Sequence, residues 1–226
     1  MIEPRDWKEY DRLIDEKLWP ETASLLKEMI AAGNQGHRAL YRLALVSLQI
    51  GDEAGYREAC QRMLVSYAET EDKGALYTTT WACALRPATL DDYEPGIIRA
   101  RRVVDLGTDT RFPLILTIAR YSEALGAVLF RAGRYNEAIK HLQVAYEALP
   151  NRRDSLARTS YLLAMTHQRL GHTTEARMLF ERANEEADKE LSDQVQPPRW
   201  DLRLTLKLFK EEAAELIGRT DKGQVK

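Results

Sequence analysis

A pair of short amphipathic segments around Gly133 recurs along this chain, and no other feature constrains the fold more. Small and apolar residues at helical spacing in 120–150 predict two helices folded back on each other, with Gly126 touching Ala138. Because one hairpin cannot bury both of its faces, the recurrence predicts a stack of hairpins. The matching residues, each 38 positions apart, are Leu125 and Leu163, Gly126 and Ala164, Gly133 and Gly171, Ala138 and Ala176, Leu142 and Phe180, and Ala145 and Ala183.

The copies that precede residue 115 match this pattern less closely. In one of them Gly51 begins the turn and Ala59 takes the place of Ala138. Eight positions separate Gly51 from Ala59, whereas five separate Gly133 from Ala138, so we expect a longer turn in this copy. The opening copy is the most degenerate, as is typical of a terminal repeat. The predicted hairpins cover residues 5–32, 37–68, 74–106, 115–149 and 154–188.

A last helix is predicted over 199–217, after a polar run that ends in two prolines. Its apolar stripe predicts a capping helix that closes the exposed end of the stack, or alternatively a helix that docks on a partner. We expect 1–218 to form a single domain and 219–226 a disordered tail. The fold class is therefore all-α, a right-handed superhelix of about five hairpins plus this helix. The stripe consists of Leu202, Leu206, Phe209, Ala213 and Leu216.

The best copy resembles the tetratricopeptide repeat (TPR), whose motif is W-x₂-L-G-x₂-Y…A-x₃-F…P. Leu125-Gly126, Ala138, Leu142 and Pro150 match its small, apolar and proline positions, while its aromatic positions depart. The small positions hold because the helices approach closely there, whereas large residues are exchangeable if volume is kept. The resemblance implies a TPR α-solenoid that acts as a non-catalytic protein-binding scaffold.

The longer stretch 38–217 also resembles the C-terminal TPR regions of bacterial serine/threonine kinases or WD40-repeat proteins. The similarity lies in segments 51–60, 81–85 and 130–135 and in the dipeptide Trp200-Asp201. It implies a larger signalling protein as a possible parent. The kinase motifs themselves are absent from the sequence, so the resemblance implies no phosphorylation by this chain.

Composition narrows the class of partner. A net charge of −2 gives no general attraction to nucleic acid or to an anionic membrane. No apolar run is long enough to span a bilayer, and the start lacks the apolar core of a signal peptide. We therefore expect a cytoplasmic protein. Cys60 and Cys83 each lie in a helical apolar pattern and are expected to be buried, isolated free thiols.

No motif of catalysis or nucleotide binding occurs in the sequence, so we expect no enzyme activity and no cofactor. His167 and His172 are five positions apart across a helix end, a poor spacing for two ligands on one helix face. We therefore expect no metal site.

In a TPR array the first helices of successive hairpins line a concave face, and the resemblance carries this role onto nine residues here. Arginine forks suit carboxylate and phosphate groups, which predicts an acidic or phosphorylated protein segment as the partner. The same side chains are equally compatible with solubility or with packing between repeats. Two further hypotheses are a sensor of a small peptide or metabolite and a structural repeat that self-associates through 199–217. The candidate groove residues are Arg38, Tyr41, Arg120, Glu123, Phe130, Arg131, Arg158, Tyr161 and Arg169.

Overall fold

The computed structural model describes residues 4–33, 36–87, 90–106, 114–148, 153–195 and 197–221. Within these ranges the chain forms eleven helices and no strand. The helices are α1 (Pro4–Asp15), α2 (Trp19–Ala31), α3 (His37–Gln49), α4 (Glu53–Ser66), α5 (Lys73–Ala84), α6 (Glu94–Asp105), α7 (Leu114–Arg131), α8 (Tyr135–Glu147), α9 (Arg153–Arg169), α10 (Thr173–Ser192) and α11 (Trp200–Asp221).

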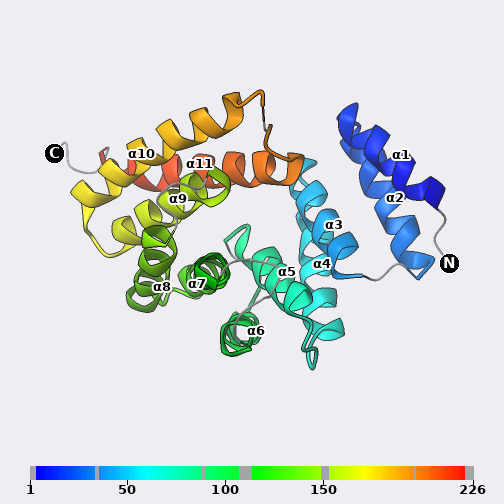
Figure 1. The fold of residues 1–226 in the computed structure, drawn as a ribbon, viewed down its shortest axis with the longest axis horizontal. Helices are drawn as coiled ribbons and strands as arrows, with labels where there is room; N and C mark the ends of the chain where they lie inside the picture. The colour runs from blue at the N-terminus through cyan, green and yellow to red at the C-terminus, as the bar shows by residue number, and fades with distance from the viewer. Residues whose placement is uncertain are drawn as a thin grey trace.

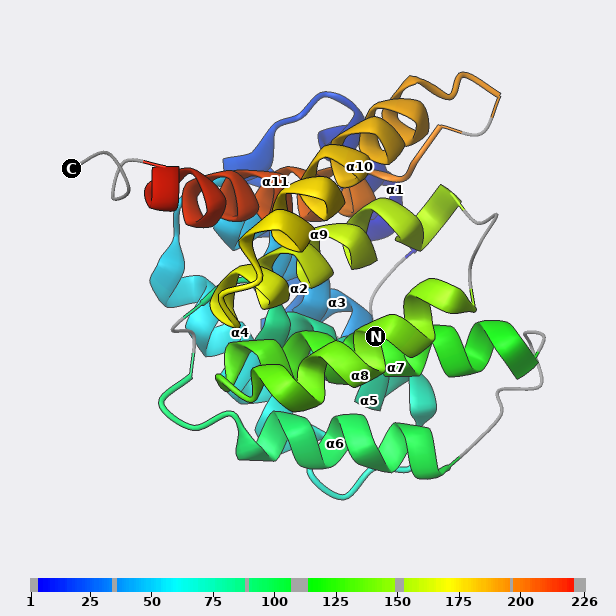
Figure 2. The ribbon, with the colours of Figure 1, turned by 90° about the vertical axis from the view of Figure 1, so that its left-hand side faces the viewer.

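The first ten helices pair into five hairpins, α1–α2, α3–α4, α5–α6, α7–α8 and α9–α10, which we number one to five. Each hairpin packs on the next, through α2 and α3, α3 and α5, α5 and α7, and α8 and α9. Figures 1 and 2 show the hairpins following one another along a curved array, with α11 on its inner side. The fold is thus a TPR-like α-solenoid with a C-terminal helix, which confirms the predicted fold class.

Glycines in the left-handed region form the turns of three hairpins. Gly51, Gly133 and Gly171 have φ values of 75°, 74° and 82°. In each turn the N–H of the following residue donates to a carbonyl five residues back, as Arg134 does to Leu129 at 3.0 Å. This is the Schellman arrangement, which satisfies carbonyls left free at a helix end and favours glycine because a side chain is strained there.

The predicted longer turn of the second hairpin is wrong. Helix α4 begins at Glu53, two residues after Gly51, as the later second helices begin after their own turn glycines. The residue five positions after Gly51 is Tyr56, which is buried and donates a 2.6 Å hydrogen bond to the carbonyl of Ala82. Matching Ala59 to the small position therefore shifted the repeat alignment and lengthened the predicted turn, because a large residue, Tyr56, occupies the true position.

Helix length, not turn length, accounts for the long period. Lys17 has φ 56° and takes the glycine position of the first turn, 34 residues before Gly51. Gly133 and Gly171 are 38 residues apart. The first of these spacings contains α2 and α3, each of 13 residues, and the second contains α8 with 13 and α9 with 17, which accounts for the difference of four. The early hairpins thus keep the shorter spacing, and the later ones are elongated.

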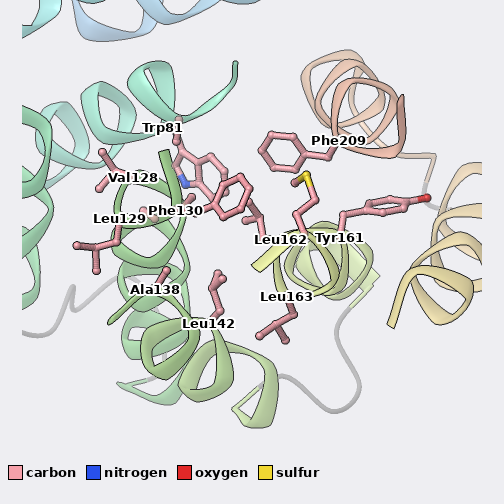
Figure 3. Packing of buried hydrophobic residues seen from close by; sticks show 14 of the residues in the cluster. Trp81, Val128, Leu129, Phe130, Ala138, Leu142, Tyr161, Leu162, Leu163 and Phe209 are labelled. Atoms are coloured by element: carbon pink, nitrogen blue, oxygen red, sulfur yellow. The ribbon is translucent and has the colours of Figure 1, made fainter. Parts of the chain in front are cut away.

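Two clusters of buried side chains form most of the core. One joins the first three hairpins and includes Leu26 and Leu85, and the other joins the last three and includes Trp81, Leu129 and Phe209 (Figure 3). Helix α5 contributes to both clusters, so the core is continuous along the array. Full burial of such a side chain contributes roughly 1.5–3 kcal/mol.

Cys60 and Cys83 are buried free thiols, as expected, but they are not isolated. Burial raises the pKa of the Cys60 thiol, and a side-chain hydrogen bond with Cys83 raises it further. The Cys60 thiol also lies 3.4 Å from the carbonyl oxygen of Ala82. The two cysteines come from adjacent hairpins, so no sequence spacing could have indicated that they meet.

The last helix is longer than predicted. It passes 217 and continues to Asp221, with Gly218 inside the helix, where a single glycine costs only about 1 kcal/mol. Residues 219–221, which we expected in the tail, are therefore helical, and 222–226 lie outside the described residues. Across the described ranges, none of the helices is both long enough and apolar enough to cross a membrane.

Substitution of Gly126 tests the close approach of α7 and α8. A Cβ atom there would lie 2.6 Å from Cγ of Leu142 and 3.2 Å from the carbonyl oxygen of Ala138. We expect Gly126→Ala to lower the free energy of unfolding by about 1–3 kcal/mol despite the better helix propensity of alanine, because overpacking outweighs it. Urea unfolding followed by circular dichroism measures the change.

The matched control is Gly218→Ala. A Cβ atom at Gly218 meets nothing within 4 Å, so this variant should gain roughly 0.5–1 kcal/mol from helix propensity alone. Equal effects of the two substitutions would show that the α7–α8 contact is loose.

Candidate functional site

The first helices of the last four hairpins contribute polar and aromatic side chains to one inner surface. We define this concave face by Tyr41 on α3, Trp81 on α5, Arg131 on α7 and Arg158 on α9. Helix α11 lies along it, in contact with α3 and α9 (Figure 1). The Phe209 ring of α11 lies 6.3 Å from the Trp81 ring. The concave face is therefore covered by a helix of the same chain.

A buried ion pair joins α7 to α9 at this face. Arg158 donates to the Glu123 carboxylate through Nε at 2.9 Å and Nη2 at 2.6 Å, and Thr159 donates to the same carboxylate at 2.8 Å. The Arg158 guanidinium also stacks 4.2 Å from the Trp81 ring centroid. Burial is the largest single effect and acts to lower the pKa of Arg158, but the charge and hydrogen bonds of Glu123, together with Tyr77 and Tyr41, outweigh it and raise that pKa.

Arg131 links three helices. Its Nε donates to the carbonyl of Ala84 at 2.8 Å and its Nη2 to that of Leu85 at 3.3 Å, at the C-terminal end of α5. The other edge of the guanidinium forms a two-pronged ion pair with Glu212 of α11, with Nη2 2.7 Å from Oε2. Its side chain is 1% exposed. Paired donation of this kind is the strongest mode of carboxylate recognition by arginine.

Aromatic side chains complete the face. Tyr41 shares a side-chain hydrogen bond with Thr205 of α11, and burial, followed by the charge of Asp201, raises the pKa of the Tyr41 phenol. Tyr77 on α5 lies 6.3 Å from Trp81. Arg120 stacks 4.8 Å from the Tyr77 ring centroid. These contacts place aromatic rings between the arginines of neighbouring hairpins.

The structure brings together five of the nine predicted groove residues, namely Tyr41, Arg120, Glu123, Arg131 and Arg158. Arg38 and Arg169 are exposed, on α3 and α9 respectively. Each of Arg38, Arg120 and Arg158 lies 13 residues before the turn glycine of its hairpin. The shared register explains why sequence alone could group them.

Tyr161 and Phe130, the other two predicted groove residues, are buried. The Tyr161 hydroxyl donates to Asn184 on α10 at 2.9 Å, and its ring lies 6.0 Å from the Phe180 ring. Phe130 is buried, with its ring 5.6 Å from that of Tyr135. Each ring therefore contacts the second helix of its own hairpin, and the Phe130 ring also lies 5.3 Å from the Arg131 guanidinium.

Tyr77 and Trp81 on α5 and Glu212 on α11 were not predicted from the sequence. The third hairpin has no turn glycine, so the register that located the other residues could not be carried onto α5. For α11 the apolar stripe was found, and Leu206, Phe209 and Ala213 are buried as predicted. The helix also packs on α9 and α10, as a cap should, but its extension along the concave face had no sequence signature.

The two C-terminal histidines meet, although their spacing seemed unsuitable. The turn between α9 and α10 brings Nδ1 of His167 within 3.3 Å of Nδ1 of His172. No group of three or more potential metal ligands occurs among the residues whose positions are described. The two rings meet because the five-residue spacing spans the Schellman turn between α9 and α10.

Residues 116–185, from α7 into α10, match the tetratricopeptide repeat family. The fold and this match together define a TPR-type α-solenoid. No curated protein matches the chain. Among solved structures, a TPR protein of Thermus thermophilus, TTC0263, is similar with 19% identity and a TM-score of 0.55, over 91% of this chain and 97% of that one.

A tetratricopeptide repeat protein from Parabacteroides merdae is also similar, with 12% identity and a TM-score of 0.55, over 96% of this chain and 76% of that one. A double mutant of MamA (RS-1) has 16% identity and a TM-score of 0.50, over 83% of this chain and 96% of that one. At these identities the likeness is one of fold.

A double-mutant cycle tests the buried pair. We expect Glu123→Gln and Arg158→Met each to lower the free energy of unfolding by about 3–5 kcal/mol, because each leaves a buried partner uncompensated. The double variant should lose clearly less than the sum of the two, as measured by urea unfolding. The control is substitution of Arg12, which forms an exposed ion pair with Glu9. This substitution should change the free energy of unfolding little. Additive losses would contradict the coupling.

Three half-buried histidines make stability depend on pH. Burial lowers the pKa of His37, His141 and His167 from the ordinary value of 6.5. The unfolded chain therefore takes up protons that the folded chain does not, and the free energy of unfolding should fall as pH drops below about 6.5. Replacement of all three by glutamine should flatten this dependence between pH 7 and 5 in urea titrations. An unchanged slope would exclude them as its source.

Proposed function

We propose that this chain is a non-catalytic protein-interaction scaffold whose concave face binds a segment of a partner protein. The observation that carries the proposal is the seating of α11 on that face, through the Phe209–Trp81 ring contact and the ion pair of Glu212 with Arg131. Tryptophan, tyrosine and arginine are the residues that most often dominate binding energy at interfaces. The face has this composition and already holds a helix.

An acidic segment is the partner that this chemistry fits best. Arg131 already binds a carboxylate, that of Glu212. Arg38 and Arg120 occupy the same register as Arg158, and the exposed Arg169 stands at the C-terminal end of α9. Since guanidinium forks bind phosphate in the same geometry, a phosphorylated segment belongs to the same class.

The alternative functions have less support. Self-association through the apolar stripe of α11 would require the helix to leave its place, because Leu206 and Phe209 are 1% and 0% exposed. A sensor of a small metabolite would use an enclosed apolar pocket, whereas this face is covered by a helix. The cytoplasmic location, the single domain over 1–218 and a parent signalling protein remain predictions from the sequence.

Affinity capture from the source cells tests the scaffold. We expect the wild-type chain to retain at least one protein that the double variant Arg38→Glu, Arg120→Glu loses by about tenfold or more, because reversed charges repel an acidic segment. The charge-matched control is Arg57→Glu, Lys140→Glu, at exposed positions on the second helices α4 and α8. Quantitative mass spectrometry measures the retention. Equal retention by the two double variants would exclude the concave face.

A further inference from the structure

Helix α11 crosses the array from the first hairpin to the last. At its start, the Trp200 ring lies 6.4 Å from that of Tyr10 and 6.1 Å from that of Trp19. Near its end, Ile217 packs with Ala176 of the fifth hairpin. A helix that only closed the end of the stack would contact α9 and α10 alone. The path of α11, visible in Figure 1, is instead that of a ligand lying in the concave face.

Two anchoring side chains on one side of α11 contact the middle of the face. Phe209 is fully buried and contacts Trp81, and Glu212, one helical turn later, pairs with Arg131. Phe209 and Glu212, three positions apart on α11, thus contact Trp81 on α5 and Arg131 on α7 respectively. The opposite side of α11 is polar and exposed, which is the pattern of an amphipathic helix in a groove.

The hairpins are joined to one another independently of α11. Contacts of α2 with α3, α3 with α5, α5 and α6 with α7, and α8 with α9 run the length of the array. The stability of such an array is approximately the sum of its repeats and their nearest-neighbour interfaces. The connection from α10 to α11 spans 193–199, is non-helical in its described residues and contains Pro197 and Pro198. Departure of α11 would uncover the concave face without parting neighbouring hairpins.

We infer that α11 is a displaceable occupant of the concave face, and that the partner is an amphipathic helix of another protein that takes its place. That helix carries an aromatic residue three positions before an acidic residue, to meet Trp81 and Arg131. This inference rests on the proposed function and specifies its ligand. A tethered helix competes at an effective concentration on the order of millimolar, so the closed chain binds the partner weakly and an opened chain binds it tightly.

Hydrogen exchange of the full chain tests whether α11 opens by itself. Amides over 203–217 should exchange about tenfold or more faster than those of α7 at the same pH, through an opening that leaves the hairpins folded. Mass spectrometry of peptides from both helices gives the two rates. Equal protection of α11 and α7 would mean that α11 leaves only on global unfolding, which would overturn the inference.

A peptide titration tests the ligand chemistry. The probe is a fluorescein-labelled peptide of residues 199–221, followed by anisotropy against the full wild-type chain and against the full chain with Phe209→Ala and Glu212→Lys. The variant, whose own α11 has lost both anchors, should bind the peptide at least about tenfold more tightly than the wild type. A peptide that itself carries Phe209→Ala and Glu212→Lys is the matched control and should bind to neither chain.

The outcomes separate the inference from the proposed function. A folded variant that binds the native peptide no more tightly than the wild type, or binds both peptides equally, would overturn the inference. If capture from cells still depends on Arg38 and Arg120, the scaffold function would survive that result with α11 as a fixed part of the fold. Light scattering could instead show a wild-type dimer in which two copies exchange α11. The occupant of the concave face would then be a second copy of this chain, and the inference of a separate partner protein would be overturned.

Discussion

A helical hairpin has more apolar surface than its own two helices can cover, and this constraint governs the whole molecule. Each inner hairpin packs on the previous hairpin and on the next, and within the fourth hairpin the two helices approach closely at Gly126 and Ala138. This packing leaves the concave face uncovered by the hairpins themselves. It is rich in aromatic rings and arginines, and the chain covers it with α11, which contributes Phe209 to the core of the last three hairpins.

Much of the fold could be predicted from the sequence because its determinants are local. The turn glycines Gly133 and Gly171, the small residues five positions later and the apolar stripe of α11 all act within a few residues of themselves. The second hairpin was misaligned for the same reason, since Tyr56 occupies a small position and only its bond to Ala82 of another hairpin reveals that it fits.

The site was only partly predictable, because its geometry depends on contacts between distant elements. Register placed Arg120 and Arg158 on the concave face, but nothing local could show that Arg158 is held by Glu123 or that Arg131 is occupied by Glu212. The sequence predicted Arg131 and Arg158 as ligand-binding groups, but in the structure each is a buried cation paired with a carboxylate of the same chain. Charge patterns thus located the surface without showing what covers it.

The position of Arg131 gives the concave face a second role. The same guanidinium that binds Glu212 also holds the terminal carbonyls of α5, Ala84 and Leu85, and so fastens the third hairpin to the fourth. An occupant that brings no carboxylate would leave this cation buried without a counter-charge and would weaken the joint it makes. The packing of the third hairpin on the fourth therefore depends on the charge of the segment that lies on the concave face.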